Sequence, residues 1–309
     1  MTQPKHVIAG TDFSDCAGHA AHRAAMLAAQ AGATLTLLHV VNRSFLAGLQ
    51  DLFGSPAHAG QALTADALRM LDQQAAQLHH RAGVSGMPTP QRKVALGSVH
   101  DELLAGSSGA ALLVLGAHGD NPLRDLLIGS TAERLLRYAA CPVLVVRRKP
   151  RGPYRRVLVP VDFSPASTAA LDLAERFAPG AATTVVHAFD APFEAKLRFA
   201  GVSQDAIQAH HDRAHRQALA KLANLERARH HRGLPAIVER EHPVRLILEA
   251  EKSRDADLIV IGRQGQSMVE EFLLGSVARR VLADAKCDVL VATGRIAAAR
   301  VADGRNTLA

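Results

Sequence analysis

The chain of 309 residues contains no tryptophan and only two tyrosines. Proteins that bind single-stranded nucleic acids commonly stack bases on aromatic side chains, and this chain supplies few of them. Its net charge of +7 comes mostly from one short segment. We therefore predict a solvated basic linker at residues 149–155 and no nucleic-acid partner. The basic residues in and beside this linker are Arg147, Arg148, Lys149, Arg151, Arg155 and Arg156.

Long hydrophobic runs and cysteines are scarce as well. The longest apolar runs, such as residues 110–116, have the length of a strand and are far too short to span a membrane. The N-terminus reaches an apolar strand at residues 6–10 without the charged and apolar stretches of a signal peptide. Three cysteines agree with a reducing compartment. These features predict a cytoplasmic protein with no membrane partner.

One glycine spacing, in contrast, occurs twice. In each half of the chain a Gly-x-x-Gly loop is followed, after nine residues, by a Gly-Ser pair. The first copy consists of Gly116, Gly119, Gly129 and Ser130, and the second of Gly262, Gly265, Gly275 and Ser276. Two copies in register indicate a tandem duplication in which each half carries its own candidate ligand site.

The order of predicted strands and helices repeats in the same way. A long polar helix at about residues 64–82, for example, has its counterpart at residues 204–232. Alternating strands and helices predict an α/β fold with a parallel sheet covered on both faces. We predict two flavodoxin-like or Rossmann-like domains, each a five-stranded parallel sheet in the order 3-2-1-4-5. The expected boundaries are 1–148 and 156–293 for the domains, 149–155 for the linker and 294–309 for a C-terminal tail.

Glycine loops at the ends of parallel strands are suited to phosphate groups. In an open parallel sheet, ligands bind at the carboxyl ends of the strands, where the strand order reverses. Glycines let the backbone approach an anion closely, and a helix that begins at Ser130 or Ser276 presents free N–H groups and its positive dipole end. Asp12 and Asp162 follow the first strand of each half and are expected at the same edge. The alternative is that the glycines only close tight turns, although their retention in both halves favours phosphate binding.

This set of residues resembles the universal stress protein family, and the likeness covers nearly residues 5–148 and 155–293. Nucleotide-binding members of that family carry Gly-x-x-Gly, nine residues, then Gly-Ser or Gly-Thr. The strand-end pattern Pro-x-Asp-Phe-Ser of the family is intact at residues 160–164, whereas Gly10 replaces the proline in the first half. The resemblance implies that each half binds ATP, with or without Mg²⁺, and that the chain is a nucleotide-dependent regulator of the stress response.

The resemblance also implies roles for single residues. The two aspartates would face the nucleoside, Val40 and Ala188 would meet adenine through backbone groups, and the loops and serines would hold the phosphates. In the first half the implied nucleotide-binding residues are Thr11, Asp12, Val40, Leu115, Gly116, Gly119, Gly129, Ser130 and Thr131. In the second half they are Val161, Asp162, Ala188, Ile261, Gly262, Arg263, Gly265, Gly275, Ser276 and Val277, with Arg263 as an extra phosphate ligand where the first half has Ala117.

Two positions depart from the family pattern. The first half has Ala111 where the second half keeps the usual aspartate, Asp257, and residues 241–243 replace the usual glycine after the third strand of the second half. Because family members pair through their last strand, we expect the two halves to pair within this chain through residues 143–146 and 289–292. A homodimer of the whole chain is compatible with the sequence.

Signs of catalysis are missing. The chain has no Gly-x-x-x-x-Gly-Lys-Ser/Thr loop and thus lacks the lysine with which such loops reach phosphates. His118 in the first loop has Gln264 as its counterpart. His211 and His215 are spaced for one helix face, but no Cys or carboxylate motif completes a metal site. We expect no catalytic and no metal-binding residue, and at most slow ATP hydrolysis. The alternatives are a nucleotide-independent scaffold that binds a protein partner and a small nucleotidyl-transfer enzyme.

Overall fold

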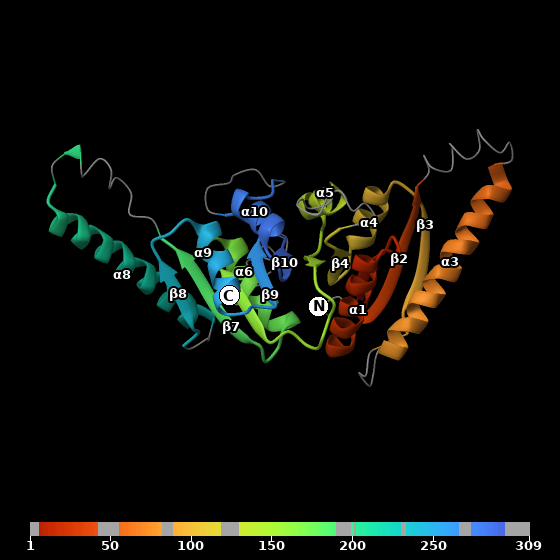
Figure 1. The fold of residues 1–309 in the computed structure, drawn as a ribbon, viewed down its shortest axis with the longest axis horizontal. Coiled ribbons are helices and arrows are strands. Elements are labelled where there is room, and N and C mark those ends of the chain that lie inside the picture. The colour runs from red at the N-terminus through yellow and green to blue at the C-terminus, as the bar shows by residue number, and fades with distance from the viewer. Residues whose placement is uncertain are drawn as a thin grey trace, which may run out of the picture.

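The computed structural model describes residues 6–42, 56–81, 89–118, 130–189, 199–200, 202–229, 233–265 and 273–293. Within these ranges strands and helices alternate along both halves of the chain, as predicted (Figure 1). The first half contains β1 (His6–Gly10), α1 (Asp15–Ala31), β2 (Thr34–Asn42), α3 (Pro56–Arg81), β3 (Gln91–Gly97), α4 (Val99–Ser107), β4 (Leu112–Gly116), α5 (Ser130–Tyr138) and β5 (Val143–Val146). The second half contains β6 (Arg156–Pro160), α6 (Pro165–Phe177), β7 (Ala182–Ala188), α8 (Gln204–Arg229), β8 (Ala236–Glu239), α9 (Pro243–Ser253), β9 (Leu258–Gly262), α10 (Ser276–Asp284) and β10 (Asp288–Ala292).

The element boundaries differ from the predicted ones mainly at the first long helix. This helix, α3, was expected from residue 64 but begins at Pro56 and ends at Arg81. The described helix thus includes residues 56–63, which the hydrophobic periodicity alone did not assign to it.

The ten strands of the described residues form one continuous sheet in the order β3-β2-β1-β4-β5-β10-β9-β6-β7-β8. Within each half the order is 3-2-1-4-5 and neighbouring strands run parallel, which confirms the predicted topology. Across the join, β5 and β10 pair antiparallel, with Leu144 opposite Leu290. The two halves therefore pair through their last strands within one chain, as expected.

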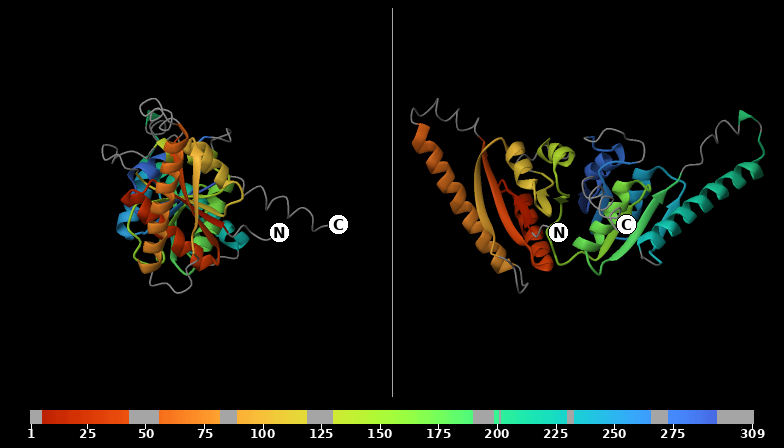
Figure 2. Two further views of the ribbon diagram at one scale, coloured as in Figure 1. Left: turned by 90° about the vertical axis from the view of Figure 1, so that its right-hand side faces the viewer. Right: turned by 180° about the vertical axis from the view of Figure 1, so that it is seen from behind.

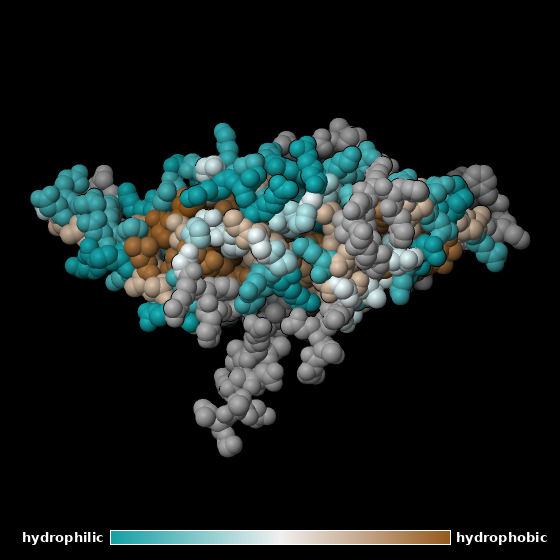
Figure 3. Space-filling view, turned by 90° about the horizontal axis from the view of Figure 1, so that it is seen from below, coloured by the Kyte–Doolittle hydropathy of each residue, from teal (hydrophilic) through white to brown (hydrophobic). Residues whose placement is uncertain are grey.

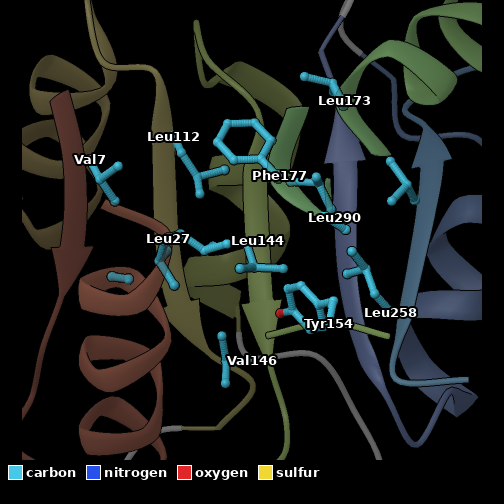
Figure 4. Close-up of a cluster of buried hydrophobic side chains, with 14 of the residues drawn as sticks. Val7, Leu27, Leu112, Leu144, Val146, Tyr154, Leu173, Phe177, Leu258 and Leu290 are labelled. Carbon is cyan, nitrogen blue, oxygen red and sulfur yellow. The ribbon is translucent and has the colours of Figure 1, made fainter. Parts of the chain in front are cut away.

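Side chains on the two faces of this sheet form two hydrophobic cores. Alternate residues of a strand point to opposite faces, so Leu144 belongs to one core and Val145 to the other. Helices α1, α3, α6 and α8 contribute to the first core, and α4, α5, α9 and α10 to the second. Both cores run through the join, where Leu144 and Leu290 lie on neighbouring strands and Tyr154 packs beside them (Figure 4).

The two long helices mark the outer ends of the molecule. Helix α3 lies beyond the edge strand β3 and α8 beyond the edge strand β8, with the join of β5 and β10 between them (Figure 1, Figure 2). Among the described helices, none combines the length and apolar character needed to cross a membrane.

A buried aspartate at the join connects both halves and the linker. Asp288 is 2% exposed; its Oδ2 accepts a hydrogen bond from the Tyr154 hydroxyl (2.7 Å), and its Oδ1 accepts one from the backbone N–H of Arg147 (2.8 Å). Arg23 of α1 places its Nε 3.5 Å from Oδ2 and its guanidinium 3.9 Å from the centre of the Tyr154 ring. The expectation of a solvated linker at residues 149–155 is thus wrong at Tyr154, which is buried because its hydroxyl has this partner.

The glycines at the ends of β4 and β9 allow a close approach between backbones. A Cβ atom on Gly116 would lie 2.9 Å from the carbonyl carbon of Cys16, and one on Gly262 would lie 2.9 Å from that of Ala166. Cys16 and Ala166 belong to the first turns of α1 and α6, so a side chain at either glycine would push the helix away from the sheet. Helix packing is a sufficient reason for these two glycines, whatever binds nearby.

Replacing Asp288 by alanine should lower the free energy of unfolding by roughly 3–5 kcal/mol, because it leaves the buried Arg23 without its ion-pair partner. Urea unfolding followed by circular dichroism would measure this loss. The matched control is Asp72→Ala on α3, which removes the exposed ion pair with Arg92 and should cost less than about 1 kcal/mol. Equal losses in the two variants would contradict the role assigned to the buried aspartate.

Replacing Gly262 by alanine should destabilise the fold by about 1–3 kcal/mol, because its Cβ would overlap the backbone of α6. The same substitution at Gly18 is the control: it lies inside α1 with open space around its Cβ position, so alanine should stabilise that helix by up to about 1 kcal/mol. Thermal unfolding of both variants would compare the two effects. A Gly262→Ala protein as stable as the wild type would refute the packing explanation.

Candidate functional site

The turn after β6 holds one carboxylate at the carboxyl edge of the sheet. Asp162 accepts a hydrogen bond at Oδ1 from the backbone N–H of Ser164 (3.0 Å), and Ser164 caps α6 by accepting one from the N–H of Ser167 (3.2 Å). Phe163 between them has a φ of 64°, a left-handed conformation that is uncommon for a bulky residue. Such strain persists only where the surroundings enforce it, and it often marks functional sites.

The first half repeats this turn after β1. Asp12 accepts hydrogen bonds at Oδ1 from the backbone N–H (3.1 Å) and the hydroxyl (2.6 Å) of Ser14, which caps α1. Phe13 has a φ of 66°. The duplicated sequence therefore produces the same strained turn and the same aspartate position twice.

A histidine on the neighbouring strand fixes each turn. The Nδ1 atom of His187 lies 2.7 Å from the carbonyl oxygen of Val161, and Nδ1 of His39 lies 2.8 Å from that of Thr11. Because a carbonyl oxygen only accepts, Nδ1 carries the proton in both bonds. The His187 ring also packs against Phe163, with 4.6 Å between ring centres. Burial lowers the pKa of His187, a shift that Lys221 supports and that the bond to Val161 and the charge of Asp162 oppose.

The two glycine segments of the second half lie against each other. The N–H of Gly275 donates to the carbonyl oxygen of Arg263 (2.8 Å), and the Cβ position of Gly265 lies 2.7 Å from Oδ2 of Asp162. Gly275 is also the N-cap of α10, and as a glycine it has no side chain to cap the first N–H groups of that helix. These N–H groups and the positive end of the helix dipole form a site for an anion.

These elements surround a cavity of about 280 Å³, at the lower end of the range for ligand pockets. All ten residues predicted in the second half line it, which places the turn after β6, the end of β7 and both glycine segments around one space. They are Val161, Asp162, Ala188, Ile261, Gly262, Arg263, Gly265, Gly275, Ser276 and Val277.

Several other residues that line the cavity were not predicted. They are Pro160, Ser167, Val186, Pro243, Ile247, Gln264 and Ala278. Pro243 and Ile247 lie in the first turns of α9 and add an apolar wall. The sequence did contain a signal for this wall, because residues 241–243 depart from the family pattern. Pro243 is the first residue of α9, whereas the first half has a glycine and a serine at this place.

The predicted residues of the first half also gather at the carboxyl ends of their strands. Strand β1 pairs with β2 and β4, so Thr11 and Asp12, which follow β1, lie between the strands that contain Val40 and Gly116. Leu115 precedes Gly116 in β4, and Ser130 and Thr131 open α5. Gly119 and Gly129 lie outside the described residues.

Arg263 forms a contact between the halves. Its side chain is buried, and Nη1 donates a hydrogen bond to the carbonyl oxygen of Arg137 (2.9 Å) in the last turn of α5. A positive charge is favourable there because the C-terminal end of a helix carries partial negative charge. The side chain predicted as an extra phosphate ligand thus lines the cavity and also contacts the other half.

One of the two histidines spaced for one helix face packs against an aromatic ring. The ring of His215 stacks on Phe189 with 5.4 Å between centres. Within the described residues, no group of three or more histidine, cysteine, aspartate or glutamate side chains is arranged to hold a metal ion.

Replacing His187 by asparagine tests the bond to Val161 and its pH dependence. An amide nitrogen can replace Nδ1 as the donor, but it does not titrate. Since the folded-state pKa lies below the ordinary value of 6.5, the wild type loses stability as the pH falls below 6.5 towards that lowered pKa. The stability difference between wild type and variant should therefore shift in favour of the variant between pH 7.5 and 5 in urea unfolding. Parallel pH profiles would contradict this account.

Comparison with known proteins agrees with the duplicated architecture. The universal stress protein family matches residues 4–147 and again residues 153–293. A universal stress protein of Mycobacterium tuberculosis (strain ATCC 25618 / H37Rv) is 28% identical over 298 residues, covering 93% of this chain and 95% of that protein. One from Mycolicibacterium smegmatis is 30% identical over 226 residues, covering 67% and 70% of the two chains.

Solved structures share the fold over nearly the whole length. The crystal structure of a universal stress protein from Archaeoglobus fulgidus covers 94% of this chain and 99% of its own, with a TM-score of 0.63 and 20% identity. The structure of a putative universal stress protein from Pseudomonas aeruginosa covers 97% and 96%, with a TM-score of 0.61 and 17% identity. With two family matches that together span most of the sequence, the chain belongs to the universal stress protein family, in its tandem two-domain form.

Proposed function

We propose that the chain binds adenine nucleotide, ATP in particular, in the cavity of its second half. The observation that carries this proposal is the convergence of all ten predicted residues of that half on one cavity. The parallel pairing of β6 with β7 and β9 brings these segments to one edge of the sheet, which is where such folds bind ligands.

The lining of the cavity has two chemically different parts. Val186, Ala188, Pro243 and Ile247 give it an apolar wall that suits a purine base. The lining also includes the loop at residues 262–265 and the start of α10, whose N–H groups suit phosphates. Asp162 lies beside Gly265, where its carboxylate would accept hydrogen bonds from ribose hydroxyls. Any Mg²⁺ would be held mainly by the phosphates, as is usual for this ion.

The same cavity is better suited to holding a nucleotide than to cleaving it. Among the described residues that line it there is no lysine, histidine or cysteine, and the one carboxylate, Asp162, is held by the backbone N–H of Ser164. A general base needs a free group within hydrogen-bond reach of the proton it removes. We therefore propose a nucleotide-dependent regulator of the stress response, with at most slow hydrolysis.

Four further properties of the chain are also proposals. They are the domain boundaries 1–148 and 156–293, the second nucleotide site in the first half, the cytoplasmic location and a homodimer. A nucleotide-independent scaffold is the competing function, and it makes the opposite prediction for bound nucleotide.

Mass spectrometry of small molecules released from the purified chain should detect adenine nucleotide. Gly265→Val should weaken ATP binding by about tenfold or more, because the added side chain meets Asp162 inside the cavity. The control is Gly60→Val on α3, where the Cβ position has open space around it. Isothermal titration of both variants with ATP, beside circular dichroism to check folding, makes the comparison. Absence of adenine nucleotide together with equal ATP titrations for wild type and Gly265→Val would favour the scaffold.

A further inference from the structure

The basic linker is held in a defined path between the two halves. The buried Tyr154 anchors its middle to Asp288, and the backbone N–H groups of Arg155 and Arg156 donate to Asp257 at 2.8 and 3.0 Å. Asp257 is the aspartate that the second half keeps and the first half replaces by alanine. Asp257 thus fixes the backbone where the linker enters β6, and the basic side chains of Arg155 and Arg156 extend from this fixed backbone.

These side chains surround a second hollow of about 720 Å³, distinct from the cavity beside α10. The linker, α1 of the first half and the segments before β9 and β10 of the second half all contribute to it. Seen from below, the middle of the molecule carries hydrophilic residues among neutral and hydrophobic ones (Figure 3). A five-residue strand rises about 3.3 Å per residue, so β9, which runs from this hollow to the cavity, separates the two by about 15 Å.

The charges that line the hollow are unbalanced. Six cationic and three anionic side chains contribute, which leaves a surplus of three positive charges. All three carboxylates already have partners: Asp288 contacts Arg23, Asp257 accepts from the backbone, and Asp255 pairs with Arg156. The surplus of three positive charges already counts the negative charge of Asp257, which the backbone N–H groups hold in place but do not cancel.

Three cations of the linker are available to a ligand. Lys149, Arg151 and Arg155 are exposed, and within the described part of the chain their side chains make no hydrogen bond or ion pair. Arg148 adds a fourth charge beside them; its Nε donates to the carbonyl oxygen of Lys286 (2.8 Å), which fixes the direction of the guanidinium. Guanidinium groups bind phosphate oxygens through paired N–H donors.

We propose that this hollow is a binding site for a compact anion that carries several linked phosphate groups. Its concave shape and volume fit a small ligand, within the usual range of ligand pockets. An extended nucleic acid fits less well, because no aromatic side chain among the described residues lines the hollow to stack a base, and Tyr154 beneath it is buried. The site lies at the opposite ends of the strands from the cavity, so it does not depend on nucleotide binding there.

Isothermal titration with sodium tripolyphosphate at about 0.15 M salt tests this site, at an ionic strength where weak surface attraction is screened. The triple variant Lys149→Gln, Arg151→Gln, Arg155→Gln should bind about tenfold more weakly or not at all, since it removes the three free charges. The control triple Lys93→Gln, Arg213→Gln, Arg216→Gln removes the same charges from exposed positions on β3 and α8 and should bind like the wild type.

Two further arms separate this site from other anion binding. Gly265→Val, which alters the cavity beside α10, should leave tripolyphosphate binding in place, whereas the linker triple should leave ATP binding to that cavity unchanged. The proposal is overturned if the wild type does not bind tripolyphosphate, if both triples lose affinity equally, or if only Gly265→Val loses it. Tighter binding of a single-stranded oligonucleotide than of tripolyphosphate, abolished by the linker triple, would also overturn it in favour of a nucleic-acid surface.

Discussion

The antiparallel pairing of β5 with β10 is the interaction on which the rest of the structure depends. It joins two five-stranded sheets into one and lets Leu144 and Leu290 belong to the same core. Without it, each half would end in an apolar edge strand with unpaired backbone groups, a surface that tends to aggregate. Asp288 at the start of β10 secures the same join through its bonds to Tyr154 and Arg147 and its ion pair with Arg23.

The pairing also places the functional regions. Because β5 and β10 lie in the middle of the sheet, the end of α5, which precedes β5, comes within reach of Arg263, which follows β9 and donates to the carbonyl oxygen of Arg137. The cavity of the second half lies on this side, at the carboxyl ends of β6, β7 and β9. Because β5 and β10 are antiparallel, the end of β5 lies beside the start of β10, and the linker runs from there to the start of β6. Its basic side chains therefore gather at the amino ends of the strands of the second half, away from the cavity.

Much of this arrangement could be predicted from sequence because it depends on local patterns that occur twice. The strand order follows from the repeated alternation of strands and helices, and the grouping of residues 261–265 with residues 275–277 follows from the duplicated glycine spacing. Pairing through the last strands was expected only from the behaviour of relatives. The burial of Tyr154 was not predictable, since its hydroxyl needs Asp288, a partner distant in sequence. The wall formed by Pro243 and Ile247 was missed because the usual glycine is absent there and the sequence pattern does not show that the start of α9 lines the cavity.

The contact from Arg263 to the carbonyl oxygen of Arg137 shows what covalent fusion allows. In a dimer of two identical chains, an arginine at this position would occur at both sites, and the same contact would form twice. Here the equivalent position in the first half is Ala117, so the contact runs in one direction only. Fusion has thus freed the two halves from identical composition, and each ligand region can acquire residues that its twin does not share. The pairing of the halves is also intramolecular, so dilution of the protein does not dissociate it.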